Sequence, residues 1–235
     1  MFKMVWDEAG KRVYETGVDR GVFYPYESGK YGTGEAWNGL ISVNESPTGG
    51  EPVPFYANNR KYLNLVSYEE LSFTIEAYSY PPGFKRCIGE TSFLPGISIG
   101  GQSKKHFGFS YRSLVGNPLY GTNHYKIHLI FDCLASSSEK SHNSRNDSPD
   151  PLTYSWDVQT GAVLVNGNFR TASVVLDSRR FEEAGLIDAF HGFEQLLYGN
   201  EKHEATLPRI FNTDGKWLWD PFKFEQDTVF TAKSD

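Results

Sequence analysis

Three short patterns in the sequence contain residue types that carry out chemistry in enzymes. Residues 96–100, GISIG, match G-x-S-x-G, the turn that presents a nucleophilic serine in many hydrolases. That turn joins a strand to a helix, whereas here Pro95 precedes the pattern and a strand-like alternating segment follows it. Ser98 is therefore a weak candidate for a nucleophile.

The second pattern is a pair of histidines. His124 and His128 have the spacing of two metal ligands on one helix face. The apolar residues around them, Ile127, Leu129 and Phe131, alternate as in a strand, which would place the two histidines about 13 Å apart. A single metal ion cannot bind both across that distance.

The third pattern is paired acids, Glu69-Glu70 and Glu182-Glu183, whose neighbouring side chains point apart and do not converge on one substrate. The sequence contains no phosphate loop, dinucleotide motif or Cys/His zinc spacing. Cys87 and Cys133 are the only cysteines, and we expect them to be buried free thiols. We therefore predict that the protein is not an enzyme and needs no cofactor or metal.

The elements around these residues read mainly as β-strands. Apolar and polar residues alternate in several segments, which predicts about six or seven half-buried strands. These segments are 21–26, 39–45, 71–80, 105–113, 125–134, 152–158 and 171–178. One further segment, about 179–198, has apolar residues at helical spacing and ends before Gly199, which predicts a single amphipathic helix on the sheet. The expected fold is a β-sandwich or split barrel with one flanking helix.

We also predict how one long connection packs and where the domain ends. The connection from Glu45 to Glu70 is too apolar for a free linker, and we expect it to dock against the protein. The domain should span 1–205, followed by 206–235 as a C-terminal arm or an additional strand.

Charge and composition exclude some classes. The net charge of −6 argues against a protein that grips nucleic-acid phosphates. The N-terminus has no apolar signal core, and no stretch approaches the length of a membrane span. Aromatic residues make up 15% of the chain, which leaves open a carbohydrate- or nucleic-acid-binding β module that would use Trp217 and Trp219.

Six segments in collinear order resemble a known family. They are GVDRGVFYP, AWNGLISVNESPTGGEPVPFYANNRKYLNL, FTIEAYSYPPGF, FGFSYRSLVGN, YKIHLIFDCLA and NDSPDPLTYSWDV. From about Gly17 to Gly199 the chain resembles the major tail protein, or tail tube protein, of long-tailed phages and prophages of Gram-positive bacteria. The C-terminal segment KWLWDPFKFE departs from that pattern.

The resemblance implies a structural virion protein. In that family, subunits form hexameric rings that stack into a hollow tail tube, assembled in the bacterial cytoplasm, and the viral genome is ejected through the bore. The implied partners are other copies of the chain, the tape measure protein, and the distal tail and tail terminator proteins. DNA would pass through without specific binding, and no membrane partner is expected.

The residues suggest where such a tube would use this chain. Glu76 and Asp157 face away from the apolar side of their predicted strands, so either could line an acidic bore or simply face solvent. The stretch around Trp37 and the connection after it suggest a joint between subunits, with candidates Trp37, Asn38, Phe55, Tyr56 and Tyr62. The alternative is that Trp37 belongs to the core of its own domain.

Overall fold

The computed structural model describes residues 4, 6–8, 10–66, 70–136, 151–166 and 169–208. Its strands are β1 (Tyr14–Glu27), β2 (Lys30–Tyr31), β3 (Glu35–Trp37), β4 (Leu40–Thr48), β5 (Pro52–Ala57), β6 (Arg60–Val66), β7 (Glu70–Ala77), β8 (Thr91–Leu94), β9 (Ile97–Ile99), β10 (Phe107–Asn117), β11 (Gly121–Ala135), β12 (Tyr154–Thr160), β13 (Val163–Asn166), β14 (Phe169–Thr171) and β15 (Ser173–Asp177). The helices are a 3-10 turn, η1 (Pro82–Arg86), and the α-helices α1 (Ser178–Glu183) and α2 (Ile187–Tyr198). The prediction of a mainly β fold is confirmed.

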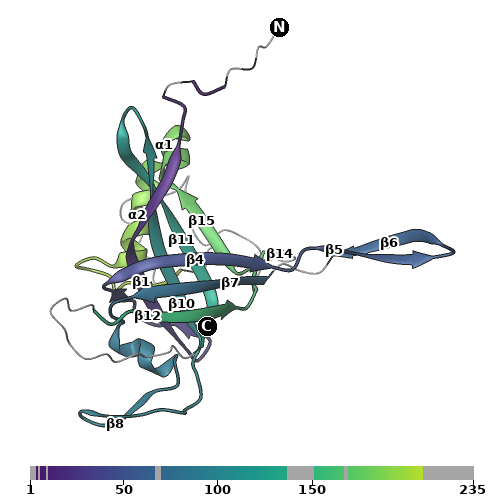
Figure 1. The fold of residues 1–235 in the computed structure, drawn as a ribbon. Coiled ribbons are helices and arrows are strands. Elements are labelled where there is room, and N and C mark those ends of the chain that lie inside the picture. The colour runs from purple at the N-terminus through teal and green to yellow at the C-terminus, as the bar shows by residue number, and fades with distance from the viewer. Residues whose placement is uncertain are drawn as a thin grey trace.

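One antiparallel sheet of nine strands organises the chain (Figure 1). Its strand order is β2-β1-β10-β11-β12-β7-β4, with β3 paired to β1 and β15 paired to β11. Strands β13–β14, β5–β6 and β8–β9 form separate two-stranded sheets. Strand β4 is thus the last strand at one end of the large sheet.

Strand β11 bends the sheet and links its two halves. Its first part pairs with β10 and β15, and only its last residues, Cys133 to Ala135, pair with β12. A register shift against β10 lies between these parts, where Asp132 has a φ of 49°. Such a bulge bends a strand and strengthens its twist. The bend carries β12, β7 and β4 across the face of the other strands.

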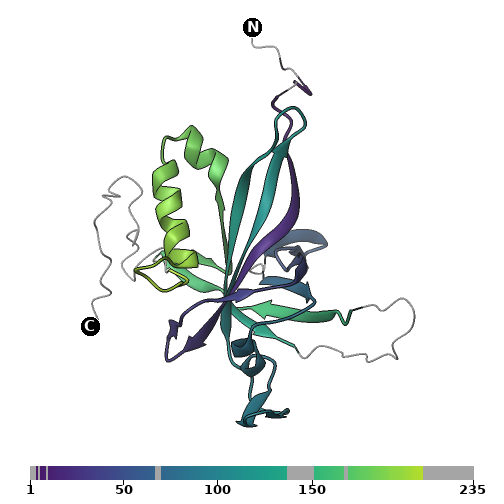
Figure 2. The ribbon, with the colours of Figure 1, turned by 90° about the vertical axis from the view of Figure 1, so that its left-hand side faces the viewer.

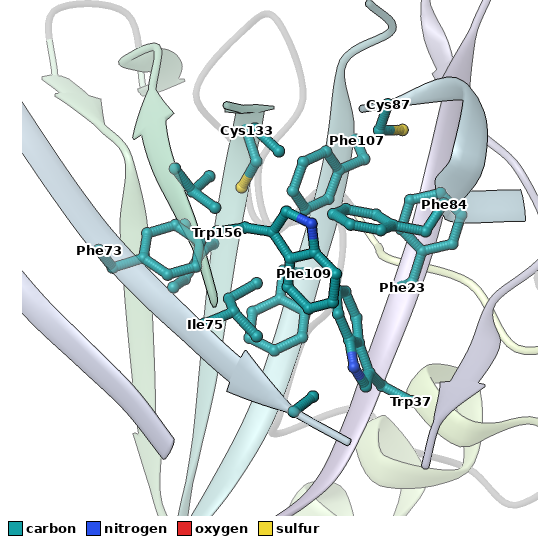
Figure 3. Packing of buried hydrophobic residues seen from close by; sticks show 14 of the residues in the cluster. Phe23, Trp37, Phe73, Ile75, Phe84, Cys87, Phe107, Phe109, Cys133 and Trp156 are labelled. Atoms are coloured by element: carbon teal, nitrogen blue, oxygen red, sulfur yellow. The ribbon is translucent and has the colours of Figure 1, made fainter. Parts of the chain in front are cut away.

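The curled sheet encloses a core dominated by aromatic rings (Figure 3). Trp156 lies at its centre and is fully buried, with Trp37 and Phe84 at ring distances of 5.6 and 5.3 Å. The core also takes residues from β7 and β10, such as Phe73 and Phe109. Cys87 and Cys133 lie in the same cluster as buried free thiols, as expected.

A second core lies between the sheet and the helices, which cover one side of it (Figure 2). Helix α2 contributes Phe190, Phe193 and Leu197 to this core, and β11 contributes Ile127 and Leu129 from its opposite face. The apolar side chains of β11 therefore contribute to two cores, one on each face of the strand.

The helical segment differs from the prediction of a single helix over about 179–198. Helix α1 ends at Glu183 and α2 begins at Ile187. Between them Gly185 has a φ of 71°, a left-handed conformation that an α-helix does not contain. The Asp177 side chain accepts a hydrogen bond from the Arg179 N–H at 3.0 Å and so caps α1.

The connection after β4 also differs from the expectation that it docks against its own chain. Residues 52–66 form the hairpin β5–β6, whose strand residues are all exposed. Figure 1 shows this hairpin extending well away from the sheet. The predicted C-terminal arm, 206–235, lies outside the described residues except for 206–208, where Leu207 is buried in the helix-side core.

Candidate functional surfaces

The outward face of β4, β7 and β12 is uniformly polar. Directly paired residues share a face of a sheet, and the pairings Ser42–Glu76–Ser155 and Asn44–Thr74–Asp157 run across all three strands. The residues of this polar face are Ser42, Asn44, Ser46, Thr48, Glu70, Ser72, Thr74, Glu76, Ser155, Asp157 and Gln159. The alternate positions, among them Ile75 and Trp156, fill the aromatic core.

Hydrogen bonds between strands hold the polar face in place. The Ser42 hydroxyl donates to Glu76 at 2.8 Å, and the Thr74 hydroxyl donates to Asp157 at 3.0 Å. The Ser72 hydroxyl donates to the carbonyl of Ser46 at 2.8 Å. Glu76 and Asp157 are thus each held by a hydroxyl donor on the neighbouring strand.

The two acids predicted for a bore, Glu76 and Asp157, lie on this one face. Glu76 is paired with Ser155, and Asp157 with Thr74, so the acids are diagonal neighbours on adjacent strands. No Lys, Arg or His stands among the residues of the polar face. The structure brings the two acids together, while their position in a bore stays a prediction. The hydroxyl residues around them were not among the predicted site residues, although the same two-residue period marks them.

Trp37 requires a correction. Its side chain is 4% exposed, and its indole N–H donates to the carbonyl of Ser79 at 2.9 Å. Its ring lies 4.6 Å from that of Phe84. Trp37 is therefore a core residue of its own chain, which is the alternative that the sequence left open. Asn38 is exposed in the turn that follows, and its carbonyl accepts a hydrogen bond from the Ser79 hydroxyl at 2.6 Å.

The hairpin β5–β6 presents the other predicted interface residues. Phe55, Tyr56 and Tyr62 are 48%, 70% and 75% exposed. Asn58 and Asn59 both have left-handed φ values, 50° and 60°, as a tight type I′ hairpin turn requires. The register pairs Phe55 with Leu63 and Val53 with Leu65, and all four residues are exposed. They form an apolar stripe on one face of the hairpin, which we call the hairpin stripe.

A second exposed hairpin, β8–β9, contains the G-x-S-x-G pattern. Gly96, with a φ of 83°, lies in the turn that joins its two strands. Ser98 pairs with Ser92 across the hairpin. The pattern is therefore a strand-to-strand turn, and the strand-to-helix geometry of a hydrolase is absent at Ser98. The exposed apolar residues of this hairpin are Phe93, Leu94, Ile97 and Ile99.

The two histidines lie on a strand, as the alternation predicted. His124 and His128 are both part of β11. His124 Nδ1 lies 3.6 Å from Glu182, whereas His128 is mostly buried and contacts Ser113. Within the part of the chain that the structure describes, no group of three or more His, Cys, Asp or Glu residues is arranged to hold a metal ion. Nor is any described helix long and apolar enough to cross a membrane.

A cavity of about 560 Å³ lies beside the turn between β1 and β2, next to η1. Its lining mixes basic and acidic side chains, and some of these are already satisfied within the chain. Arg86 pairs with Glu27 at 3.1 Å, and Glu35 accepts the backbone N–H of Gly83 at 3.1 Å. This mixture of charges does not select one class of ligand.

No protein-family model matches the chain, and no curated protein matches its sequence. Among solved structures, a chain of the extracellular contractile injection system PVC, in its extended sheath–tube complex, is 8% identical, with 67% of this chain and 88% of that chain covered and a TM-score of 0.36. A chain of the anti-feeding prophage baseplate is 12% identical, with 74% and 97% covered and a TM-score of 0.37. Hcp1 from Flavobacterium johnsoniae is 9% identical, with 60% and 90% covered and a TM-score of 0.29. Because each TM-score is below 0.5, these likenesses assign neither a family nor a function.

Proposed function

We propose that this chain is the structural subunit of a phage tail tube, assembling with copies of itself into stacked hexameric rings through which the viral genome is ejected. The observation that carries the proposal is the polar face of β4, β7 and β12, which places Glu76 and Asp157 among hydroxyl and amide side chains. The sequence resemblance to tail tube proteins, collinear from about Gly17 to Gly199, supports the same role.

The polar face has the chemistry that a conduit for DNA needs. Basic side chains bind DNA by neutralising phosphates and releasing counterions, and this face has none. Its acids repel the phosphates, while the neutral hydroxyl groups make the surface wettable. DNA would therefore slide past this face without specific binding.

The position of β4 offers a way to close the ring. β4 is the last strand in the order of the large sheet, and an end strand presents unpaired backbone groups that a second chain can pair with. Pairing between neighbouring copies would continue the polar face from subunit to subunit and remove the exposed edge. Six copies would then enclose a bore lined by Glu76 and Asp157.

The exposed hairpin β5–β6 supports contacts between copies. The hairpin stripe of Val53, Phe55, Leu63 and Leu65 exposes large apolar side chains on an element that extends from the domain (Figure 1). An isolated two-stranded hairpin is at best marginally stable in water, so a partner that covers the stripe would stabilise it. We assign Phe55, Tyr56 and Tyr62 to such contacts within or between rings, with Asn38 at their periphery.

The tube role also defines the partners and the location that we propose. The tape measure protein would occupy the bore before ejection, and the distal tail and tail terminator proteins would contact the two ends of the tube. Assembly would take place in the cytoplasm of the bacterial host, and the mature location is the tail of the virion.

Size-exclusion chromatography with light scattering over a concentration series, followed by negative-stain microscopy of the heavy fractions, tests assembly. We expect rings or tubes about 100 Å wide, as six domains of this size around a bore would give. A matched pair of variants sharpens the test: Phe55→Ser with Leu63→Ser in the hairpin stripe should abolish tubes, while Phe93→Ser in β8–β9 serves as the control for lost apolar surface elsewhere. A wild-type chain that stays monomeric even when mixed with tail initiator complexes would overturn the proposal.

The alternative of a carbohydrate- or nucleic-acid-binding module gains no support from the described residues. Its candidates Trp217 and Trp219 lie outside them. Trp37 and Trp156 are buried and offer no stacking platform. Retention of the chain on a polysaccharide or DNA column at physiological salt would favour this alternative.

A further inference from the structure

His128 lies where the edge strand β4 meets the strands that carry the helices. Its ring stacks on the ring of Tyr111 from β10, with centroids 4.4 Å apart and planes within 2°. Glu45 of β4 faces the same pair, and the Tyr111 hydroxyl donates to its carboxylate at 2.7 Å. On the other side of His128 lie Ser113 and Glu15. These residues come from four strands, β1, β4, β10 and β11.

The hydrogen bonds of Ser113 determine which nitrogen of His128 carries the proton. The Ser113 hydroxyl donates its single proton to Glu15 at 2.5 Å. Ser113 Oγ also lies 2.9 Å from His128 Nε2, and toward that atom it must accept. Neutral His128 therefore carries its proton on Nε2.

The other nitrogen, Nδ1, is then a hydrogen-bond acceptor without a donor. Nδ1 is buried and has no hydrogen-bond partner. Glu45 Oε1, which is also an acceptor, lies 4.0 Å from it. An unpaired buried polar atom is costly, and two facing acceptors repel each other. A proton on Nδ1 would attract the carboxylate, and a small approach of the two side chains from 4.0 Å would form a charge-assisted hydrogen bond to Glu45.

We propose that His128 and Glu45 form a proton-dependent bridge between β11 and the edge strand β4, absent when His128 is neutral and closed when Nδ1 gains a proton. The carboxylate of Glu45 then has two donors, Tyr111 and His128, in place of one. The bridge fixes β4 to the body of the domain from the side opposite its polar face.

The pKa of His128 depends on its burial and on the charged groups around it. Burial lowers its pKa below the ordinary value, and the carboxylates of Glu45 and Glu15 oppose that effect, while Lys126 adds to it. Lys126 pairs with Glu15 at 2.5 Å. Burial alone would raise the pKa of Glu15, but its hydrogen bonds from Lys126 and Ser113 lower it overall, so Glu15 remains an acceptor. Burial and Glu45 raise the pKa of Tyr111, which remains a donor.

The bridge has a consequence for assembly that depends on the proposed function. If β4 pairs with a neighbouring copy, the position of the β4 edge changes when His128 binds a proton. Acidification below the pKa of His128 would then change the assembly of rings, whereas the bridge itself exists in a single chain.

The first test is therefore made on the unassembled chain at low concentration. The pKa and the tautomer of His128 are measured by proton–nitrogen NMR in the wild type and in Glu45→Gln. We expect the Nε2–H tautomer at neutral pH, and a pKa that falls by about 1 pH unit in Glu45→Gln because the attracting carboxylate is lost. Glu70→Gln, which removes an exposed carboxylate from the neighbouring strand β7, is the control and should leave the pKa unchanged. Equal pKa values in the wild type and Glu45→Gln would overturn the bridge.

A second variant decides the question if Glu45→Gln does not fold. Tyr111→Phe removes the competing donor and keeps the stacked ring, so Glu45 should interact more strongly with protonated His128 and raise its pKa. An unchanged or lower pKa in Tyr111→Phe would contradict the bridge. Microscopy of assemblies at pH 5 and pH 8 separates the two proposals. Absence of tubes at both pH values would count against the tube, whereas the bridge is tested by the NMR titration alone.

Discussion

The hairpin β5–β6 and the strand pair β7–β12 share an alternation of apolar and polar residues but lie in opposite environments. In β7, Phe73 and Ile75 are 2% and 0% exposed. In β6, Leu63 and Leu65 alternate with polar residues in the same way but are 39% and 57% exposed. The two regions differ in what packs against their apolar side chains. β7 faces the aromatic core of the curled sheet, whereas the hairpin extends away from that core. Alternation defines the face of a strand, but only the fold decides whether that face is covered.

Trp37→Ala should produce the largest effect, because this residue belongs to the covered region. Removing a large buried aromatic side chain costs about 3–5 kcal/mol through lost contacts and the cavity left behind. We expect a loss of this size in the free energy of unfolding of the unassembled chain, measured by urea denaturation. An effect below about 1 kcal/mol would contradict its place in the core.

His128→Gln should alter how stability depends on pH. Because burial lowers the pKa of His128, the folded chain binds fewer protons than the unfolded chain below about pH 6.5. The contribution of neutral His128 is thus present above that pH and is lost as the pH falls, by at most about 1.4 kcal/mol per pH unit. Urea denaturation between pH 7.5 and 5 should show a shallower decline in His128→Gln than in the wild type. A parallel decline in both chains would contradict this assignment.

Tyr56→Ser should leave the stability of the unassembled chain nearly unchanged, which is the counterpart of Trp37→Ala. Tyr56 is 70% exposed on the hairpin, and exposed substitutions usually stay within about 0.5 kcal/mol. The same variant should weaken assembly, seen as a higher concentration required for tubes in light scattering. A stability loss comparable with that of Trp37→Ala would mean that the hairpin packs on its own chain in solution.

The double variant Glu76→Gln with Asp157→Asn should have the smallest effect on folding. Both replacements keep an oxygen that accepts the hydrogen bonds from Ser42 and Thr74, so unfolding should change by no more than about 0.5 kcal/mol. Its counterpart, Glu76→Lys with Asp157→Lys, should make assembled tubes retain DNA in a salt-dependent way. If tubes with lysines and wild-type tubes retain DNA equally, the polar face does not line the bore.

Much of the fold could be predicted because strand alternation is a local property. The predicted segments 71–80, 105–113, 125–134 and 152–158 contain or overlap β7, β10, β11 and β12. The same alternation placed Glu76 and Asp157 on a face opposite the core. The predicted helix was wrong in its continuity, because Gly185 adopts a left-handed conformation between α1 and α2.

The sequence by itself determined which side chains share a face of each strand, since successive residues on a strand must point to opposite sides. The same period marks the hydroxyl residues beside the acids in β4, β7 and β12, but the tertiary structure decided that these three strands lie next to one another. Only the tertiary structure decided that Trp37 is covered and Tyr56 is not, and that Glu45 of β4 faces His128 of β11. The physical reason is that burial and such distant pairs depend on how the sheet bends at β11 and closes over its core, which no local pattern records.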